Sequence, residues 1–316
     1  MQKQKIFIVA HYAYGYIDYI IEELKSRENI EVDFFYFGVK KYKYKSFFQK
    51  IENFFSKTFL KKNLKDQWLE QDIRSKMKGH YDTIFVIRPD MLSDSIHRML
   101  KKNSNYYITY LFDNFKRMPK QAHILPFFDK VFSYEKEDCA KYQLEFATNY
   151  ITTENYKSDT FEYLLYNIAT FDERFGILKK IAVFLDNKKI SFKFRLYTPN
   201  EKEDSLIDFF HNHMAISEVL DEIKKAKIII DIQREGQLGL TFRVFEALGN
   251  NKKLITTNID IVNYNFYNPK NIYVIDDKNP IIEIPEDFIK SDYEIIDDII
   301  LNQYRLPFWV DRVFFK

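Results

Sequence analysis

The segment from Lys225 to Asn258, KAKIIIDIQREGQLGLTFRVFEALGNNKKLITTN, determines how we interpret the rest of the chain. Its β-branched run Ile228–Ile232 predicts a buried strand, and a polar, glycine-containing loop follows from Gln233 to Gly239. A helix is expected from about Thr241, stopped by Gly249, and Leu254–Thr257 predicts the next strand. The segment is therefore a strand–loop–helix–strand unit of the kind that builds α/β folds.

This unit also predicts where a ligand would bind. In open α/β sheets, ligands bind outside the carboxyl ends of the strands, where a helix N-terminus offers unpaired N–H groups and the positive end of its dipole. The loop from Gln233 to Thr241 occupies that position. It is the first candidate for a binding site.

The helix places its polar and apolar side chains on different faces. A core-facing stripe is expected from the residues at i, i+3, i+4 and i+7, which are Thr241, Val244, Phe245 and Leu248. Arg243 and Glu246 fall on the opposite face. They could form an exposed ion pair contributing a few tenths of a kcal/mol. Alternatively, the guanidinium meets a phosphate and the carboxylate accepts hydrogen bonds from a ribose or sugar.

Residues 239–249, GLTFRVFEALG, followed by KLITTN at 253–258, resemble the nucleotide-sugar-binding segment of GT-B glycosyltransferases. The resemblance is to bacterial group-1-like enzymes and to the CgeB-like branch associated with lipopolysaccharide and capsule synthesis. It implies that the backbone amides or hydroxyl of Gly239, Leu240 and Thr241 hold the donor diphosphate, and that Glu246 binds the ribose hydroxyls.

The chain departs from the family pattern at one position. Many group-1 enzymes carry a donor-sugar glutamate eight residues before the ribose glutamate, and Leu238 stands there in this sequence. Glu235 or Gln237 are the alternatives for that contact. The donor sugar and the choice between retention and inversion therefore stay open.

The first 37 residues predict a Rossmann-like half. Strands are expected at Ile6–Ala10 and Val32–Phe37, with a helix at Tyr16–Leu24 between them. The loop His11–Gly15 lacks a GxGxxG motif, so a dinucleotide-type pyrophosphate turn is not supported. The resemblance places this loop on the acceptor side of an interdomain cleft, where His11 could act as a base or bind a donor phosphate. His11 could equally be a structural hydrogen-bonding residue.

Residues 39–80 are basic and aromatic, with twelve Lys and Arg against four Asp and Glu. A basic amphipathic helix is expected because Phe47, Phe48, Ile51, Phe54, Phe55 and Phe59 recur at helical spacing. In one interpretation this stripe packs on the sheet. In the other, the segment rests on an anionic membrane surface. Nucleic-acid binding is not expected, because no stacking platform or zinc pattern accompanies the segment and the formal charge of the chain is only +2.

Two later strands are followed by carboxylates. Strands at Tyr81–Ile87 and Tyr106–Leu111 precede Asp90 and Asp113, respectively. Asp90 lies in the motif IRPD and Asp113 in YLFDN, and the motif FFDKVFSYEKED follows them. These three motifs resemble the N-domain of the same glycosyltransferase branch. The resemblance makes Asp90 and Asp113 candidate general bases for an acceptor hydroxyl. Either carboxylate could instead cap the next helix.

The second half begins after a polar stretch at Thr148–Ser158. Phe161–Thr170 predicts its first strand, and the resemblance makes Arg174, at the following strand–helix junction, a contact of the donor diphosphate; it could also be a solvated side chain. A later helix, Ser217–Lys225, is expected to have Ser217 as its N-cap. The apolar tail Tyr304–Val310 resembles the GT-B segment that returns to the N-domain.

Length and composition complete the expectation. The chain of 316 residues fits two domains, which we place at 1–155 and 156–300, followed by a returning segment at 301–316. A single cysteine, Cys139, excludes an internal disulfide and favours a reducing cytoplasm. No signal peptide or membrane span is expected. Neither Asp260 nor Asp276-Asp277 forms a DxD-type metal motif, so metal independence is predicted.

We therefore expect an α/β protein with two Rossmann-like domains facing a cleft. Its predicted function is transfer of a sugar from a nucleotide-activated donor to a surface polysaccharide or lipid-linked glycan, without metal or cofactor. The protein would be cytoplasmic and could be peripheral on the inner face of the membrane. A nucleotide-sugar epimerase or hydrolase and a non-catalytic membrane-associated binding protein with a degenerate GT-B fold are the alternatives.

Overall fold

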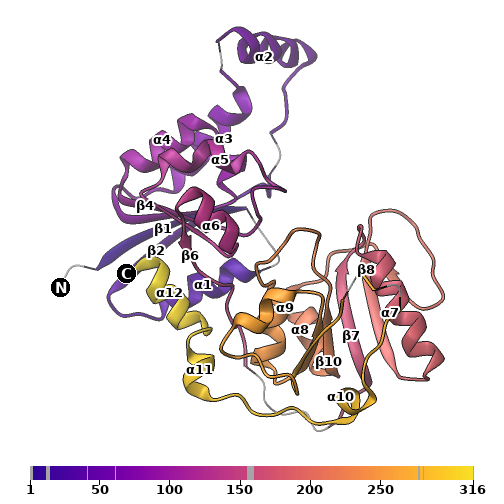
Figure 1. Ribbon diagram of the computed structural model, residues 1–316. Coiled ribbons are helices and arrows are strands. Elements are labelled where there is room, and N and C mark those ends of the chain that lie inside the picture. Colours follow the sequence, from indigo (N-terminus) through magenta and orange to yellow (C-terminus); the bar gives the residue numbers. More distant parts are fainter. Residues whose placement is uncertain are drawn as a thin grey trace. The chain divides into compact units, whose positions relative to one another are not determined.

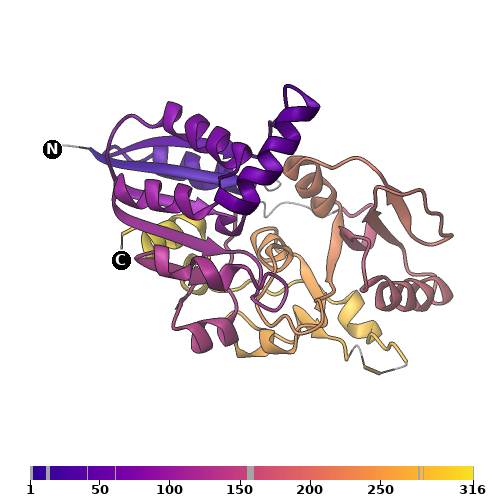
Figure 2. The ribbon, with the colours of Figure 1, turned by 90° about the horizontal axis from the view of Figure 1, so that it is seen from above.

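A computed structural model describes residues 3–11, 15–40, 42–60, 62–154, 160–276, 278–279 and 281–315. The chain forms two compact units, one of residues 1–147 with 313–316 and the other of residues 148–312 (Figure 1; Figure 2 gives the view from above). The end of the chain, from Val313, is grouped with the N-terminal half. Expected features at residues 12–14 and 155–159 and at Asp277 lie outside the described residues.

The first unit is built on a six-stranded parallel sheet in the order β2-β1-β3-β4-β5-β6. Its strands are β1 (Gln4–His11), β2 (Ile30–Phe37), β3 (Tyr81–Ile87), β4 (Ser104–Leu111), β5 (Lys130–Ser133) and β6 (Glu145–Phe146). Residues 6–10 and 84–87 are fully buried, which is expected of parallel strands covered by helices on both faces. The strand order reverses between β1 and β3, because β2 lies on one side of β1 and β3 to β6 follow on the other.

Helices cover both faces of this sheet (Figure 1). The helices of the first unit are α1 (Tyr16–Lys25), α2 (Phe47–Leu60), α3 (Leu64–Lys76), α4 (Asp94–Lys102), α5 (Gln121–Ile124) and α6 (Lys136–Tyr142), with short 3₁₀ turns η1 (Pro89–Met91) and η2 (Leu125–Phe127). Residues 39–80 hold two helices, so the expectation of one was wrong. The break follows from Asn63, whose side chain accepts a hydrogen bond from Lys65 N at 3.1 Å and caps α3.

The second unit repeats the parallel arrangement with the order β12-β11-β10-β7-β8-β9. Its strands are β7 (Tyr163–Thr170), β8 (Phe192–Tyr197), β9 (Asp208–Phe210), β10 (Ala226–Asp231), β11 (Lys253–Thr256) and β12 (Ile272–Val274). The strand order reverses between β7 and β10. This is the switch point at which open α/β sheets bind ligands.

The helices of the second unit connect these strands. They are α7 (Phe175–Asn187), α8 (Ile216–Lys224), α9 (Phe242–Gly249), α10 (Glu286–Lys290), α11 (Asp298–Asn302) and α12 (Leu306–Phe314), with a 3₁₀ turn η3 (Ile259–Asn263). The end of α12 reaches into the first unit, where the ring of Phe314 lies 4.9 Å from that of Phe85. The tail is therefore an ordered helix that belongs partly to each unit.

One predicted helix start was wrong, and one predicted helix end was right. Helix α8 begins one residue before Ser217, and the Ala215 N–H donates to the Glu218 carboxylate at 2.9 Å, which closes the first turn without a hydroxyl cap. Helix α9 ends at Gly249, as predicted. A Cβ there would lie 2.4 Å from the Thr153 carbonyl oxygen and 2.6 Å from Ile151 Cγ2, so Gly249 lets the chain at 151–153 approach the helix.

Among the described residues, the longest apolar helical stretches fall short of what is needed to cross a bilayer.

Candidate functional site

The switch point of the second sheet brings together the residues that follow β7 and β10. Asp172 and Arg174 come directly after β7, and Arg234 lies in the loop after β10. The two strands are hydrogen-bonded neighbours, with Ile228 opposite Leu165. Their carboxyl ends therefore meet, and charged groups 60 residues apart in sequence form one cluster.

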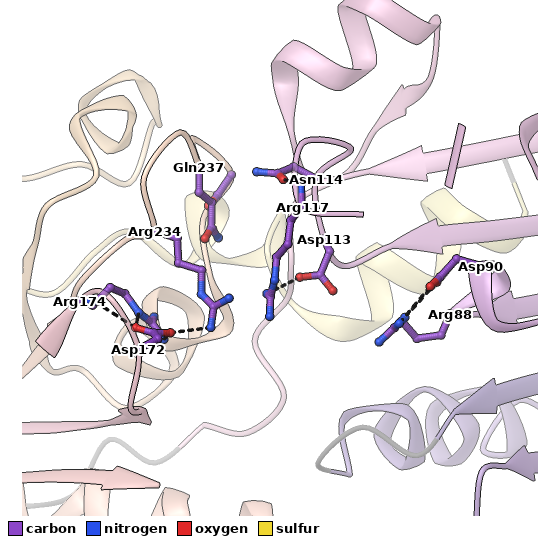
Figure 3. A network of polar contacts seen from close by, with 10 residues as sticks. Arg88, Asp90, Asp113, Asn114, Arg117, Asp172, Arg174, Arg234 and Gln237 are labelled. Atoms are coloured by element: carbon purple, nitrogen blue, oxygen red, sulfur yellow. Dashed lines mark hydrogen bonds and ion pairs between the residues drawn. The ribbon is translucent and has the colours of Figure 1, made fainter. Parts of the chain in front are cut away.

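In this cluster, two guanidinium groups hold one carboxylate (Figure 3). Arg174 donates from Nε to Asp172 Oδ1 at 2.8 Å and from Nη2 to Oδ2 at 2.7 Å, a bidentate pair. Arg234 Nη2 donates to the same Oδ2 at 2.6 Å. Arg174 also reaches the Ile232 carbonyl from Nη1 at 3.2 Å, which ties the loop after β10 to the start of α7.

The cluster carries one positive charge more than negative. Burial raises the pKa of Asp172, but the hydrogen bonds and charge of Arg174, with that of Arg234, outweigh it and leave the pKa lowered. The carboxylate is thus ionised at neutral pH and neutralises one of the two arginines. Arg174 is the N-cap residue of α7, so the excess charge stands at the positive end of a helix dipole. The expected alternative of a solvated Arg174 was wrong.

The loop leading into α9 is fixed through its carbonyl groups. Asn258 Nδ2 donates to the Leu238 oxygen and Asn149 Nδ2 to the Leu240 oxygen, each at 2.8 Å. Gln237 Nε2 donates to the Gly239 oxygen at 3.4 Å. Side-chain amides of three residues therefore fix the backbone of the loop that the sequence analysis predicts to bind a diphosphate. Leu238, at the family's donor-sugar position, is half-buried, and Glu235 is exposed.

Thr241 is the N-cap of α9 rather than part of its core-facing stripe. Its hydroxyl accepts from the Arg243 N–H at 3.2 Å and also hydrogen-bonds the carboxyl of Asp231. A diphosphate contact by Thr241 would therefore come from the backbone. The cap explains why the helix begins at Phe242.

Arg243 and Glu246 form an ion pair between Nη1 and Oε2, but this pair is buried. The Glu246 side chain is 1% exposed and that of Arg243 is 15% exposed, so the prediction that they face away from the core was wrong. The physical reason is that Arg243 lies over the end of β7, where its Nη2 donates to the Ile168 carbonyl at 3.4 Å. A helix with neighbours on several sides has no solvent face. The ribose-binding role of Glu246 stays a prediction.

Asp231 ends β10 beneath this helix and is also buried. Burial raises its pKa, while Arg243, the Thr241 hydroxyl, Arg174 and Gln233 act in the opposite direction. Gln233 Nε2 donates to Asp231 Oδ2 at 2.6 Å, and its backbone N–H donates to Thr257 Oγ1 at 2.9 Å. Asp231 therefore connects the start of the ligand loop with the start of α9.

The first unit has its own polar edge at the carboxyl ends of β1, β3 and β4, which are adjacent in the sheet. Asp90 accepts from Arg88 at both oxygens, Nε to Oδ1 and Nη2 to Oδ2, each at 3.0 Å. Asp113 Oδ1 accepts from Arg117 Nη1 at 2.6 Å (Figure 3). Neither carboxylate caps the next helix, because the N-cap of α4 is Ser93 and that of α5 is Lys120. Arg88 adopts a left-handed conformation with φ of 60°, which turns its side chain back onto Asp90.

His11 ends β1 and packs against the next strand. Its ring centroid lies 5.4 Å from that of Phe37 in an edge-to-face arrangement. Gly38 leaves room for this ring, because a Cβ there would lie 2.5 Å from His11 Nε2. His11 thus packs at the carboxyl end of β1, and the neighbouring strand β3 leads to Asp90.

Sequence reasoning missed Arg234, Asp172, Asp231, Arg88 and Arg117. A usable signal existed for Arg234, because it lies inside the loop already singled out. The Asp-x-Arg spacing of Asp172 and Arg174 would have indicated a bidentate pair. Within the described residues, no group of three or more His, Cys, Asp or Glu side chains is arranged to hold a metal ion.

Comparison with solved structures gives similar folds at low identity. An α-glucosyltransferase in complex with UDP and a 13-mer DNA containing an HMU base matches with a TM-score of 0.59 and 10% identity, covering 99% of this chain and 93% of that one. MnaA of S. aureus with UDP matches with a TM-score of 0.52 and 14% identity, covering 98% and 94%. No protein-family model and no curated protein sequence matches the chain. The likeness shows the fold, two Rossmann-like α/β units of the GT-B class.

Proposed function

We propose that the protein is a glycosyltransferase that uses a nucleotide-diphosphate sugar as its donor. The observation that carries this proposal is the Arg174–Asp172–Arg234 cluster at the switch point of the second sheet. It combines an excess positive charge with the N-terminus of α7, in a fold whose similar structures contain UDP. A diphosphate is the ligand that this combination of guanidinium groups and helix dipole fits.

The cluster supplies what the reaction needs at the leaving group. During transfer, the bond between the sugar's anomeric carbon and the diphosphate oxygen breaks, and the acceptor oxygen forms the new bond to that carbon. Negative charge then builds up on the diphosphate. Arg174 and Arg234 are already oriented by Asp172, so they can stabilise this charge without first losing solvent, which is electrostatic preorganisation.

The loop and helix that follow would bind the rest of the donor. Gly239, Leu240 and Thr241 lie at the start of α9 and contribute backbone groups to the diphosphate, and Gln237 lies beside them. Glu246 would accept hydrogen bonds from the ribose hydroxyls, and Arg243 would meet a phosphate. Because Glu246 is buried against Arg243, this role requires the ligand to enter beside the pair, or Arg243 to shift toward a phosphate when the donor binds.

The acceptor hydroxyl must lose its proton, and the first unit offers three candidates. Asp113 is favoured over Asp90 because Arg117 engages only one of its oxygens and is half-exposed, whereas Arg88 occupies both oxygens of Asp90. His11 is the third. A glycan of the cell surface or a lipid-linked glycan is the acceptor that the sequence resemblance favours.

A thermal-shift panel tests the donor claim. UDP-, GDP-, ADP-, dTDP- and CMP-linked sugars are compared without metal on the wild type, on Arg174→Gln and on Lys180→Gln, an exposed control on the same helix. Binding to the native state raises the unfolding free energy by RT ln(1 + [L]/Kd), and the unfolding temperature rises as a result. One nucleotide series should stabilise the wild type and Lys180→Gln but not Arg174→Gln. No response in any series, or equal responses in all three proteins, would contradict the proposal.

A further inference from the structure

Helix α2 exposes its apolar side chains instead of burying them. The exposed fractions are 71% for Phe47, 81% for Phe48, 64% for Phe54, 53% for Phe55, 75% for Phe59 and 39% for Ile51. The expectation that this stripe packs on the sheet was therefore wrong. With 3.6 residues per turn, the six side chains share an arc of about 140° on one side of the helix. A helix on the surface of a globular protein normally turns such a face inward.

The inward side of α2 is polar. Among its side chains that the structure describes, only Asn53 is buried, at 5% exposure. Asn53 Nδ2 donates to the Tyr44 hydroxyl at 2.9 Å, and Asn53 Oδ1 accepts from Leu64 N at 2.7 Å. A single amide thus ties α2 to the chain on both sides of it, and this contact orients the aromatic arc outward. Figure 1 shows α2 beyond α3, covering neither face of the sheet.

Positive charge accompanies the aromatic arc. Lys50 and Lys57 are exposed and fall together along one edge of it, and Lys43 and Lys45 precede the helix. Glu52 is the only acidic residue of α2. The surface therefore combines exposed aromatic side chains with lysines along their border. This is the pattern of helices that lie in the interface of anionic membranes.

We propose that α2 docks this arc on an anionic lipid bilayer, with its phenylalanines in the headgroup and acyl boundary and its lysines against lipid phosphates. The helix has 14 residues, so it lies on the bilayer and does not cross it. A second copy of this chain is the less suitable occupant, because pairing two such faces would bring the lysines of both copies together. Docking at the membrane is independent of the proposed donor site and would place the first unit where lipid-linked molecules are found.

Vesicle co-sedimentation of the whole chain tests this proposal. Wild-type protein should bind phosphatidylcholine vesicles that also contain phosphatidylglycerol and bind poorly to phosphatidylcholine alone. The variant Phe48→Ser/Phe55→Ser should lose binding to both. Lys50→Gln/Lys57→Gln should weaken binding to the anionic vesicles by about tenfold or more, since each lysine near the surface contributes about fivefold, and added salt should weaken the wild type likewise.

Matched controls separate docking from general surface effects. Ile295→Ser removes an equally exposed apolar side chain from the second unit, and Lys102→Gln/Lys120→Gln removes two exposed cations elsewhere on the first. Both should bind as the wild type does. All substituted side chains are exposed, so unfolding temperatures should change little. Equal binding by the phenylalanine variant would overturn the proposal. So would failure of the wild type to bind, together with self-association in light scattering that the phenylalanine variant abolishes, because that result identifies a second copy as the occupant.

Discussion

The guanidinium of Arg174 and the carboxylate of Asp172 share two parallel hydrogen bonds, at 2.8 and 2.7 Å, across the turn that joins β7 to α7. The pair fixes Arg174 in place while Asp172 neutralises one positive charge, and Arg234 restores the excess of positive charge. Because the two partners are only two residues apart, the pair forms with little loss of chain entropy. The geometry at the switch point is thus encoded locally, and Arg234 is added by the loop after β10.

Replacing Asp172 by Asn should separate the effect of the cluster on donor binding from its effect on the orientation of Arg174 and Arg234. The change removes a charge that opposes a diphosphate but releases both arginines from their fixed positions. We expect donor binding to change little, while turnover falls by roughly tenfold to a hundredfold because leaving-group stabilisation depends on preorganised donors. Steady-state kinetics that resolve kcat from KM check this prediction. A turnover number equal to that of the wild type would show that orientation by Asp172 is unimportant.

Glu246→Ala should destabilise the protein by about 3–5 kcal/mol, because it leaves the Arg243 guanidinium buried without its partner. Urea unfolding measures this loss. Glu246→Gln keeps the shape and a hydrogen-bond acceptor and should cost less. The amide variant is therefore the one to use for ribose binding, and a fully stable Glu246→Ala protein would argue against the buried pair.

Gly249→Ala and Gly176→Ala should have opposite effects. The new methyl at 249 would collide with backbone at Thr153 and cost about 1–3 kcal/mol of unfolding free energy. At 176, in α7, a Cβ meets nothing within 4 Å, so alanine should stabilise by about 0.4–1 kcal/mol. Thermal and urea unfolding of the two variants check both signs, and equal effects would contradict the close approach at Gly249.

Two buried lysines predict how stability depends on pH. Burial lowers the pKa of Lys252 to about 8, and burial with the charge of Lys227 lowers that of Lys253 to about 8, from 10.5 in an unfolded chain. Between pH 8 and pH 10 the unfolded state therefore binds more protons than the folded state. Unfolding free energy should rise with pH in this window, by at most about 1.4 kcal/mol per pH unit for each lysine.

The comparison of wild type with Lys253→Met isolates one of these contributions. The Lys253 side chain is fully buried, and its Nζ donates to Ser291 Oγ at 2.7 Å, so methionine fills the space without the proton. The variant should show a smaller rise in stability from pH 8 to pH 9.5 by urea titration. An identical slope in both proteins would mean that Lys253 keeps its ordinary pKa when folded.

The sequence predicted most strands because buried parallel strands are continuous apolar runs, such as residues 6–10 and 228–230. It also selected the loop at 233–241 and Arg174, whose roles in ligand binding stay predictions. It placed Glu246 on a solvent face because helical periodicity describes one helix alone, while the burial of Glu246 depends on Arg243 meeting the end of β7, a contact between residues 75 positions apart. The role of Arg234 depends in the same way on strand order.

The aromatic stripe of α2 shows the opposite failure. Its periodicity correctly predicted a helix, and the usual rule that apolar faces point inward then predicted packing on the sheet. Whether such a face is covered depends on which side the connecting segments attach, and Asn53 attaches the polar side. A single buried amide in a basic aromatic helix carries no sequence signal strong enough to reverse that rule.

The most direct test of the central claim is the affinity of the wild type for UDP, UMP and uridine by calorimetry, repeated on Arg174→Gln and Arg234→Gln. If the cluster binds the diphosphate, UDP should bind the wild type at least about tenfold more tightly than UMP, because hydrogen bonds between charged groups contribute about 1.5–3 kcal/mol each. Both variants should reduce that ratio toward one while uridine binding stays unchanged. A UDP preference that persists undiminished in both variants would show that the diphosphate is bound elsewhere.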